Sequence, residues 1–340
     1  MKAIVVRGTM DMVMEERPMP RITDPDQVLV RIHAAGICGS DVHVFHGTNP
    51  FAKYPVVLGH EASGEIVEAG QNVTDLKAGD SVVFEPITYC GQCYACRHGH
   101  HNVCRDLQVL GCIVDGVFRE YAVMPRSQVY QFDSTKMTYQ QAALCEPYTI
   151  GAQANSRGDV QKDDLVLVHG AGPIGLIVAD VAKSRGAKVI ISEPNEKRLE
   201  MARAFGLDYP INPMKQDLDQ FINELTDGEG VNVIFDAAGI PAIISHAVEQ
   251  LSPAGRFVPM TFGKEPIPVN FKVLNAKQLT ILGTRHQYQK FPEIVDLLPQ
   301  KLDHVDLLTT HVFPADDFMT AFNTLADPAS GACKVVLTFA

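Results

Sequence analysis

The segment DLVLVHGAGPIGLIVADVAKSRGAKVIISEP, residues 164–194, constrains the fold of this chain most strongly. Gly170, Gly172 and Gly175 form the pattern G-x-G-x-x-G directly after an apolar run that is typical of a buried strand. An amphipathic helical stretch follows, and a second apolar run ends at Glu193, 18 residues after the last glycine. Such glycines let the backbone approach a pyrophosphate at a helix N-terminus, while the acidic residue binds ribose hydroxyls. The segment therefore predicts a βαβ unit that binds a dinucleotide.

Glu193 also bears on which dinucleotide is bound. Its carboxylate would accept hydrogen bonds from both ribose hydroxyls and repel a 2′-phosphate, so NAD is favoured over NADP. Arg198, five residues further on, could reach the adenosine end and weaken that preference, or it could be a solvated helix residue. Pro173 and Ile174, inside the glycine motif, complete the cofactor-binding residues that we predict for this segment.

The pattern of apolar runs changes near residue 140. Before it, short runs such as QVLVRIHAAG and GEIVEAG alternate with Gly, Pro and Asp turns, which is typical of an irregular, mostly antiparallel β domain. After it, strand-like runs alternate with helical stretches, which indicates a parallel sheet covered by helices. The C-terminal segments fit that repeat poorly. We therefore predict an α/β protein with one domain from residues 1–145 and 287–340 and a second from residues 146–286.

Composition and charge argue against several classes of protein. The formal net charge is −11 and no run of Lys or Arg interrupts it, which disfavours nucleic acid or an anionic membrane as partner. The N-terminal segment lacks the features of a signal peptide, and no stretch of about 18 apolar residues could span a bilayer. A cytoplasmic location is the expectation, and the eight cysteines are then expected to be thiols or metal ligands.

Four of these cysteines lie in the segment CGQCYACRHGHHNVC. They follow the spacing C-x2-C-x2-C-x7-C and supply enough thiolates to close a tetrahedral Zn²⁺ site. An iron–sulfur cluster or four unpaired thiols remain open on spacing alone. A site with four protein ligands has no position for substrate, so we interpret the segment at about 88–106, the cysteine lobe, as a structural brace. Its predicted ligands are Cys90, Cys93, Cys96 and Cys104.

A second group of metal-ligating residues lies in the segments GICGSDVH and GHEASGEIVEAGQNV. Cys38, His60 and Glu61 offer one sulfur, one nitrogen and one oxygen atom, a mixed set that suits Zn²⁺. Glu146, in CEPYTI, could be a fourth ligand, directly or through water, or a structural carboxylate. Fewer than four permanent protein ligands leave a position for a substrate hydroxyl, which the metal would acidify.

The segment GHEASGEIVEAGQNV fits the signature G-H-E-x2-G-x5-G of the zinc-dependent medium-chain alcohol dehydrogenases. The chain resembles that family over essentially its whole length, and most closely the sorbitol and threonine dehydrogenase branch, because Glu146 stands where plain alcohol dehydrogenases have cysteine. Within this branch it is similar to bacterial enzymes of the L-galactonate and L-gulonate 5-dehydrogenase type. The resemblance implies a GroES-like, mostly β catalytic domain, a doubly wound Rossmann domain, two zinc ions per chain and an NAD cofactor.

The resemblance also implies roles for single residues around the second metal. Cys38 and His60 would be zinc ligands, and Asp41 would hold the ring of His60 in one tautomer. Glu61 and Glu146 would be a direct and a water-bridged or alternating ligand, in an order that the sequence leaves open.

Further roles implied by the resemblance concern the reaction and the assembly. Ser40 would take the alcohol proton, and His43 would pass it toward solvent unless it is an ordinary surface histidine. Ala238, in the strand-end segment DAAG, would contact the nicotinamide half of the cofactor, or be only part of a turn. Relatives pair through the edge of the cofactor sheet, and the apolar segment QLTILGT suits such a joint, so a homodimer or homotetramer is expected.

These features predict an enzyme that transfers hydride from a secondary alcohol to NAD⁺. The expected substrate is a sugar acid such as L-gulonate or L-galactonate, oxidised to the 5-keto acid. Arg285, in TRHQYQK, is the candidate cation for its carboxylate, and could instead be a surface arginine. A polyol or threonine is the alternative substrate. A zinc-free enone reductase and a non-catalytic NAD-binding regulatory protein are the alternative classes, and either would be expected to have lost Cys38, His60 or Ser40.

Overall fold

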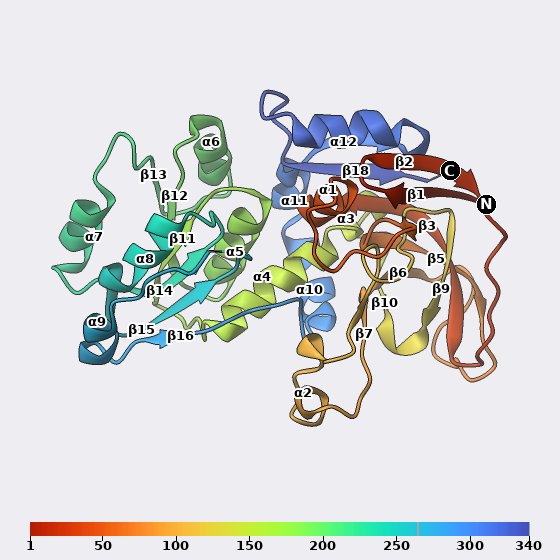
Figure 1. Cartoon of the computed structure of the whole chain (residues 1–340), viewed down its shortest axis with the longest axis horizontal. Helices are drawn as coiled ribbons and strands as arrows, with labels where there is room; N and C mark the ends of the chain where they lie inside the picture. The colour runs from red at the N-terminus through yellow and green to blue at the C-terminus, as the bar shows by residue number, and fades with distance from the viewer. Residues whose placement is uncertain (264, 340) are drawn as a thin grey trace. The chain divides into compact units, whose positions relative to one another are not determined.

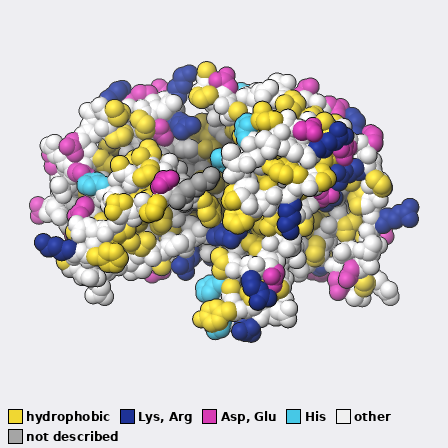
Figure 2. Space-filling model, in the orientation of Figure 1, with side chains coloured by type: hydrophobic (Ala, Val, Ile, Leu, Met, Phe, Trp, Pro, Cys, Tyr) yellow, Lys and Arg dark blue, Asp and Glu magenta, His cyan; other side chains and the backbone are white. Residues whose placement is uncertain are grey.

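The computed structural model describes residues 1–263 and 265–339. The chain divides into two compact units, and the first of them contains both ends of the chain. Acidic and basic side chains are interspersed over the face that Figure 2 shows. No described helix combines the length and apolar character needed to cross a membrane. The two units are Met1–Glu146 with Tyr288–Ala340, and Pro147–Gln287.

The first unit is built on β-sheets, as predicted (Figure 1). Its largest sheet has seven strands in the order β10-β6-β5-β3-β18-β17, with β9 also paired to β3. Only β17 and β18 pair in parallel; the other pairs are antiparallel. The strands are β3 (Gln27–Ile37), β5 (Glu61–Ala69), β6 (Ser81–Phe84), β9 (Tyr121–Pro125), β10 (Val129–Gln131), β17 (Thr309–Pro314) and β18 (Lys334–Thr338).

The alternation of side chains between the two faces of β3 explains how this sheet covers an apolar core. Val28, Val30 and Ile32, two residues apart, are fully buried in one apolar cluster, because successive side chains of a strand point to opposite faces. The C-terminal strand β18 extends the same sheet, pairing Val335 with Ile37 of β3. Residues near the end of the chain are thereby brought beside the end of β3.

The rest of the first unit consists of small sheets and short helices. A three-stranded sheet has the order β2-β1-β4, and β7 pairs with β8. These strands are β1 (Lys2–Gly8), β2 (Asp11–Glu16), β4 (Val56–Val57), β7 (Ile87–Thr88) and β8 (Gln108–Val109). The helices are α1 (Gly39–Phe45), α2 (Tyr94–Arg97), α3 (Tyr139–Ala142), α10 (Phe291–Leu297), α11 (Leu302–Leu308) and α12 (Phe318–Ala326), with 3₁₀ turns η1 (His101–Val103), η2 (Arg126–Gln128), η3 (Leu298–Gln300) and η4 (Ala315–Asp317).

The second unit is a parallel sheet of six strands in the order β13-β12-β11-β14-β15-β16. The order reverses between β11 and β14, and sheets of this kind bind ligands outside the carboxyl ends of their strands at such a point. The strands are β11 (Leu165–His169), β12 (Lys188–Ser192), β13 (Tyr209–Ile211), β14 (Val231–Asp236), β15 (Leu251–Pro259) and β16 (Thr280–Ile281). The helices are α4 (Cys145–Arg157), which begins in the first unit, α5 (Pro173–Ser184), α6 (Glu196–Ala204), α7 (Leu218–Thr226), α8 (Pro241–Gln250) and α9 (Phe271–Ala276).

Candidate active site

Three predicted metal ligands converge in the first unit. Cys38 follows β3 as the N-cap residue of α1, and His60 directly precedes Glu61, the first residue of β5. Strands β3 and β5 pair in a register that sets Gly36 opposite Glu61, so the two motifs meet at one end of the sheet. One ligand atom from each of Cys38, His60 and Glu61 lies within 4.8 Å of the others. One thiol, one imidazole and one carboxylate at such distances fit a single zinc ion.

Asp41 organises this group from the first turn of α1, where it is 1% exposed. Its carboxylate accepts hydrogen bonds from the backbone N–H of Cys38 at 2.9 Å and of Gly59 at 3.2 Å. The same carboxylate lies 3.4 Å from Nδ1 of His60. Because Nδ1 faces Asp41, Nε2 of His60 is left to bind a metal, the arrangement that commonly orients histidine ligands.

Lys334 is a member of this site that sequence reasoning missed. It begins β18 and is only 3% exposed, and its ammonium donates to both carboxylate oxygens of Glu61, which is 1% exposed. Burial lowers the pKa of Lys334, but Glu61 and Cys38 outweigh it and hold the pKa above its ordinary value. Gly36 makes room for the pair, since a Cβ there would lie 2.3 Å from Oε2 of Glu61. The sequence feature that could have pointed to Lys334 is its position as a single cation inside the apolar segment CKVVLTF.

Glu146 is buried at the start of α4, with 6% of its surface exposed. Burial raises its pKa to about 7, while the charge of His60 acts to lower it. Within the described residues Glu146 is not a member of the group whose ligand atoms lie within 4.8 Å of one another. The structure therefore brings Cys38, His60 and Glu61 together and places Glu146 within electrostatic range of them.

Ser40 and His43 both lie on α1, downstream of Cys38. Ser40 is half-buried and His43 is exposed. Nδ1 of His43 is 2.9 Å from the hydroxyl of Thr48, which also donates to the backbone carbonyl of His43. The predicted pair of proton-transferring residues thus lies on one short helix that begins at a predicted metal ligand.

The cysteine lobe contains a second group of ligands, on α2, η1 and the loops around them. The Sγ atom of Cys93 lies 3.5 Å from that of Cys96 and 3.8 Å from that of Cys104. The Sγ atoms of Cys90 and Cys104 are 3.4 Å apart. Thiolates bound tetrahedrally to one zinc ion are about 3.8 Å apart, and no disulfide links the described cysteines. Backbone N–H groups of Arg105 and Cys96 lower the pKa of Cys93 to about 6. The lobe therefore fits a closed zinc site.

The glycine motif forms the turn between β11 and α5 in the second unit. Gly170 has φ +94°, a left-handed conformation that favours glycine, and a Cβ on Gly175 would lie 1.9 Å from the carbonyl oxygen of Gly170. Gly172 is the N-cap of α5, and Pro173 and Ile174 are its first residues. The N–H groups in the first turn of this helix of 12 residues are suited to bind a pyrophosphate.

Glu193 directly follows β12 and is 4% exposed. It accepts hydrogen bonds of 2.9 Å from the backbone N–H of Ala171, inside the glycine motif, and of Asn195. Arg198 Nη1 lies 3.8 Å from Oε2 of Glu193. Ala238 follows β14 and donates its backbone N–H to Asp236 at 3.3 Å. The predicted cofactor residues therefore gather at the carboxyl ends of β11, β12 and β14.

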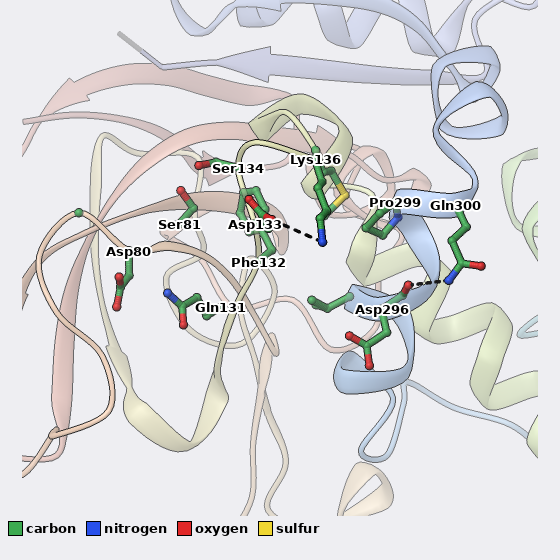
Figure 3. A pocket seen from close by; sticks show the side chains of 13 residues that line it. Asp80, Ser81, Gln131, Phe132, Asp133, Ser134, Lys136, Asp296, Pro299 and Gln300 are labelled. Carbon is green, nitrogen blue, oxygen red and sulfur yellow. Dashed lines mark hydrogen bonds and ion pairs between the residues drawn. The ribbon is translucent and has the colours of Figure 1, made fainter.

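Two features of the separate units remain to be described, Arg285 and a cavity. Arg285 is half-buried in the second unit, after β16. A cavity of about 750 Å³ in the first unit is lined by Asp80, Asp133, Lys136, Asp296 and other residues (Figure 3). Lys136 lies 3.6 Å from Asp133, and Gln300 donates to the backbone of Asp296 at 3.2 Å. None of the predicted ligands is among the described residues that line this cavity.

A dinucleotide turn and a mixed cysteine, histidine and carboxylate group together define a zinc-dependent dehydrogenase. Comparisons with known proteins agree with this class. The family model of the alcohol dehydrogenase GroES-like domain matches residues 24–134, and the family model of the zinc-binding dehydrogenases matches residues 173–300. The chain belongs to the zinc-dependent medium-chain alcohol dehydrogenase family and is an oxidoreductase that acts on CH–OH groups, which confirms the predicted family, fold class and enzyme class.

The relatives cover nearly the whole chain. The starvation-sensing protein RspB of Escherichia coli is 38% identical over 100% of this chain and 99% of its own length. Sorbitol dehydrogenase of Halalkalibacterium halodurans is 34% identical over 99% of both chains. A solved structure of the rspB alcohol dehydrogenase from E. coli CFT073, in complex with NADH, is 37% identical over 99% of both chains with a TM-score of 0.93. The chain thus covers nearly the whole length of these relatives.

Proposed function

We propose that this dehydrogenase oxidises a secondary alcohol group of a sugar acid with NAD⁺. The observation that carries the proposal is the convergence of Cys38, His60 and Glu61 within 4.8 Å, in a chain that also has the dinucleotide turn. Cys38 and His60 would hold the zinc ion with a carboxylate of Glu61 or Glu146. When bound, zinc acidifies a hydroxyl group that binds beside it.

The chain's own side chains would move the released proton. Ser40 follows Cys38 by two residues in the first turn of α1 and would accept the proton from the substrate hydroxyl. His43 on the same helix, hydrogen-bonded to Thr48, would pass it to solvent, because it is exposed. The glycine turn would hold NAD⁺, which supplies the acceptor for the hydride when it is bound. No covalent intermediate with the protein is needed.

The choice of NAD rests on Glu193. Its buried carboxylate lies beside the glycine turn, where it would bind the ribose hydroxyls and repel a 2′-phosphate. The NADH complex of the rspB relative supports the same cofactor.

Replacing Glu193 by alanine is expected to raise the KM for NAD⁺ by about tenfold to a hundredfold, because a hydrogen bond to a charged group contributes about 1.5–3 kcal/mol. The preference for NAD⁺ over NADP⁺ should shrink at the same time, since the repulsion of the 2′-phosphate is removed. Steady-state kinetics with both dinucleotides measures the ratio. Lys197→Ala, at an exposed position of α6, is the matched control and should not lower the affinity for NAD⁺. A Glu193→Ala enzyme that keeps the original preference would contradict this role.

The sugar-acid substrate rests on Arg285. The sorbitol dehydrogenase relative supports a polyhydroxylated substrate, and a guanidinium group would add recognition of a carboxylate. A polyol is the second candidate, favoured by the same relative. A screen of aldonates, polyols and L-threonine with NAD⁺ tests the substrate class, and the absence of turnover with every aldonate would overturn the sugar-acid proposal.

Replacing Arg285 by alanine is expected to lower kcat/KM for the best aldonate by about tenfold to a hundredfold, since one charge-assisted hydrogen bond is lost. The matching polyol has no carboxylate, so its kcat/KM should change by less than about twofold. The two rates measured on one enzyme preparation provide the internal control. Equal losses for both substrates would show that Arg285 has a structural role only.

A homodimer or homotetramer is part of the proposal. Strand β16 forms one edge of the parallel sheet, and Ile281 on it is 40% exposed. An apolar edge strand of this kind is suited to pairing with a second copy of the chain.

A further inference from the structure

A second cavity, of about 550 Å³, lies in the second unit beside the dinucleotide turn. Two of the residues that line it are the last residues of neighbouring strands: His169 of β11, directly before Gly170, and Ser192 of β12, directly before Glu193. The other wall comes from the segment 213–217 that precedes α7, from the start of α7 and from α8. The cavity therefore begins where the pyrophosphate and ribose sites end.

This position identifies the part of the cofactor that the cavity can take. In a fold of this kind the glycine turn holds the pyrophosphate and the acidic residue after the second strand holds the adenosine ribose. The base is attached to that ribose, so it must lie next to Glu193 on the side away from the pyrophosphate. The cavity is large enough for a purine.

The lining of this cavity carries a chain of polar side chains. Nε2 of His246, on α8, lies 2.7 Å from one carboxylate oxygen of Asp219 on α7. The amide of Gln250 donates to the other oxygen of Asp219 at 2.7 Å, and its own oxygen lies 3.2 Å from Nε2 of His169. All four side chains line the cavity. Two helices and the first strand of the βαβ unit thus hold one carboxylate in a fixed position.

The carboxylate of Asp219 remains able to accept further hydrogen bonds. Its side chain is 50% exposed, and a carboxylate has about four acceptor positions, of which His246 and Gln250 use two. Although partial burial raises its pKa, Gln250 and His246 lower it below the ordinary value, so Asp219 is ionised near neutral pH. Burial lowers the pKa of His169 to about 4, which leaves that ring neutral. Lys215, a cation that also lines the cavity, is paired with Glu196 at 2.7 Å, so Asp219 is presented as a negative acceptor.

A negative acceptor in a base pocket discriminates between purines by the group at position 6. The amino group of adenine is a donor and can bind a carboxylate, whereas the 6-oxo group of hypoxanthine is an acceptor that the carboxylate repels. We propose that Asp219, held by His246 and Gln250, accepts a hydrogen bond from the amino group of the adenine base and is the residue that selects adenine dinucleotides. The inference rests on the proposed use of NAD.

The test compares binding of NADH with that of reduced nicotinamide hypoxanthine dinucleotide, by titration calorimetry on the full-length protein. The wild-type protein is expected to bind NADH about tenfold to a hundredfold more tightly, the range for one hydrogen bond to a charged group. Asp219→Asn should reduce this ratio below about twofold, because an amide can accept from the amino group and donate to the oxo group. Asp217→Asn is the matched control, since Asp217 also borders the cavity but caps α7 through the N–H of Gln220, a role that asparagine fills equally well. It should keep the wild-type ratio.

The outcomes separate this inference from the proposed function. Failure of the wild-type protein to bind either dinucleotide would overturn the proposed use of NAD and this inference with it. Tight binding of NADH with equal affinity for the hypoxanthine analogue would overturn the inference alone, whatever the variants do. An Asp219→Asn protein that loses affinity for both dinucleotides equally would reduce Asp219 to a structural residue.

Discussion

Replacement of Cys38 by serine is expected to lower kcat on the order of a thousandfold or more. Its side chain is one of the predicted ligands gathered within 4.8 Å at the end of β3, and its loss should release the metal of that site. Without the metal a substrate hydroxyl keeps its ordinary, very high pKa, and several kcal/mol of stabilisation are lost. Turnover of the best substrate and zinc content measured on the same sample check the prediction, with zinc falling from two ions per chain to one, since two ligand groups are present.

Two further measurements make this result specific. Cys112→Ser alters a half-buried cysteine that belongs to neither ligand group, so it should keep both zinc ions and full turnover. Circular dichroism should report the same secondary structure for both variants, because the cysteine lobe keeps its own four ligands. A Cys38→Ser protein that has lost one zinc ion and still oxidises its substrate at the original rate would refute the metal-dependent scheme.

Much of this site could be predicted because its signals are local. The glycine turn depends on the backbone conformation of Gly170 and on the close approach of Gly175, and both are properties of single residue types. The predicted ligands Cys38 and His60 lie in short motifs, and the closely spaced cysteines of the lobe need only a loop to bring them together. Residue type and spacing therefore carry most of the information.

The residues that were missed are placed by long-range pairing. Lys334 is 273 residues from Glu61 and reaches it only because β18 pairs with β3, a register that the apolar pattern of CKVVLTF does not specify. Asp219 and His246 lie on separate helices, where isolated polar residues are expected to be solvated. Their juxtaposition beside His169 depends on how α7 and α8 pack on the sheet, which periodicity within one helix cannot reveal.

Replacement of Lys334 by methionine is expected to lower the free energy of unfolding by about 3–5 kcal/mol, the usual cost of removing one partner from a buried ion pair. Methionine approximates the length of the lysine chain, so the main change is the loss of the charge. Glu61 is 1% exposed and would keep its carboxylate buried without the ammonium that now binds both of its oxygens. Urea denaturation followed by circular dichroism measures the difference between the two proteins.

The double variant Lys334→Met with Glu61→Gln separates the charge from the packing. If the cost comes from the unpaired carboxylate, removing that charge as well should restore a large part of the lost stability, and the two single changes will not add. Lys2→Met is the matched surface control, since the ion pair of Lys2 with Asp316 is open to solvent and should contribute far less. Equal effects of Lys334→Met and Lys2→Met, or strictly additive single changes, would mean that Lys334 and Glu61 are not coupled and that Glu61 does not depend on the C-terminal strand.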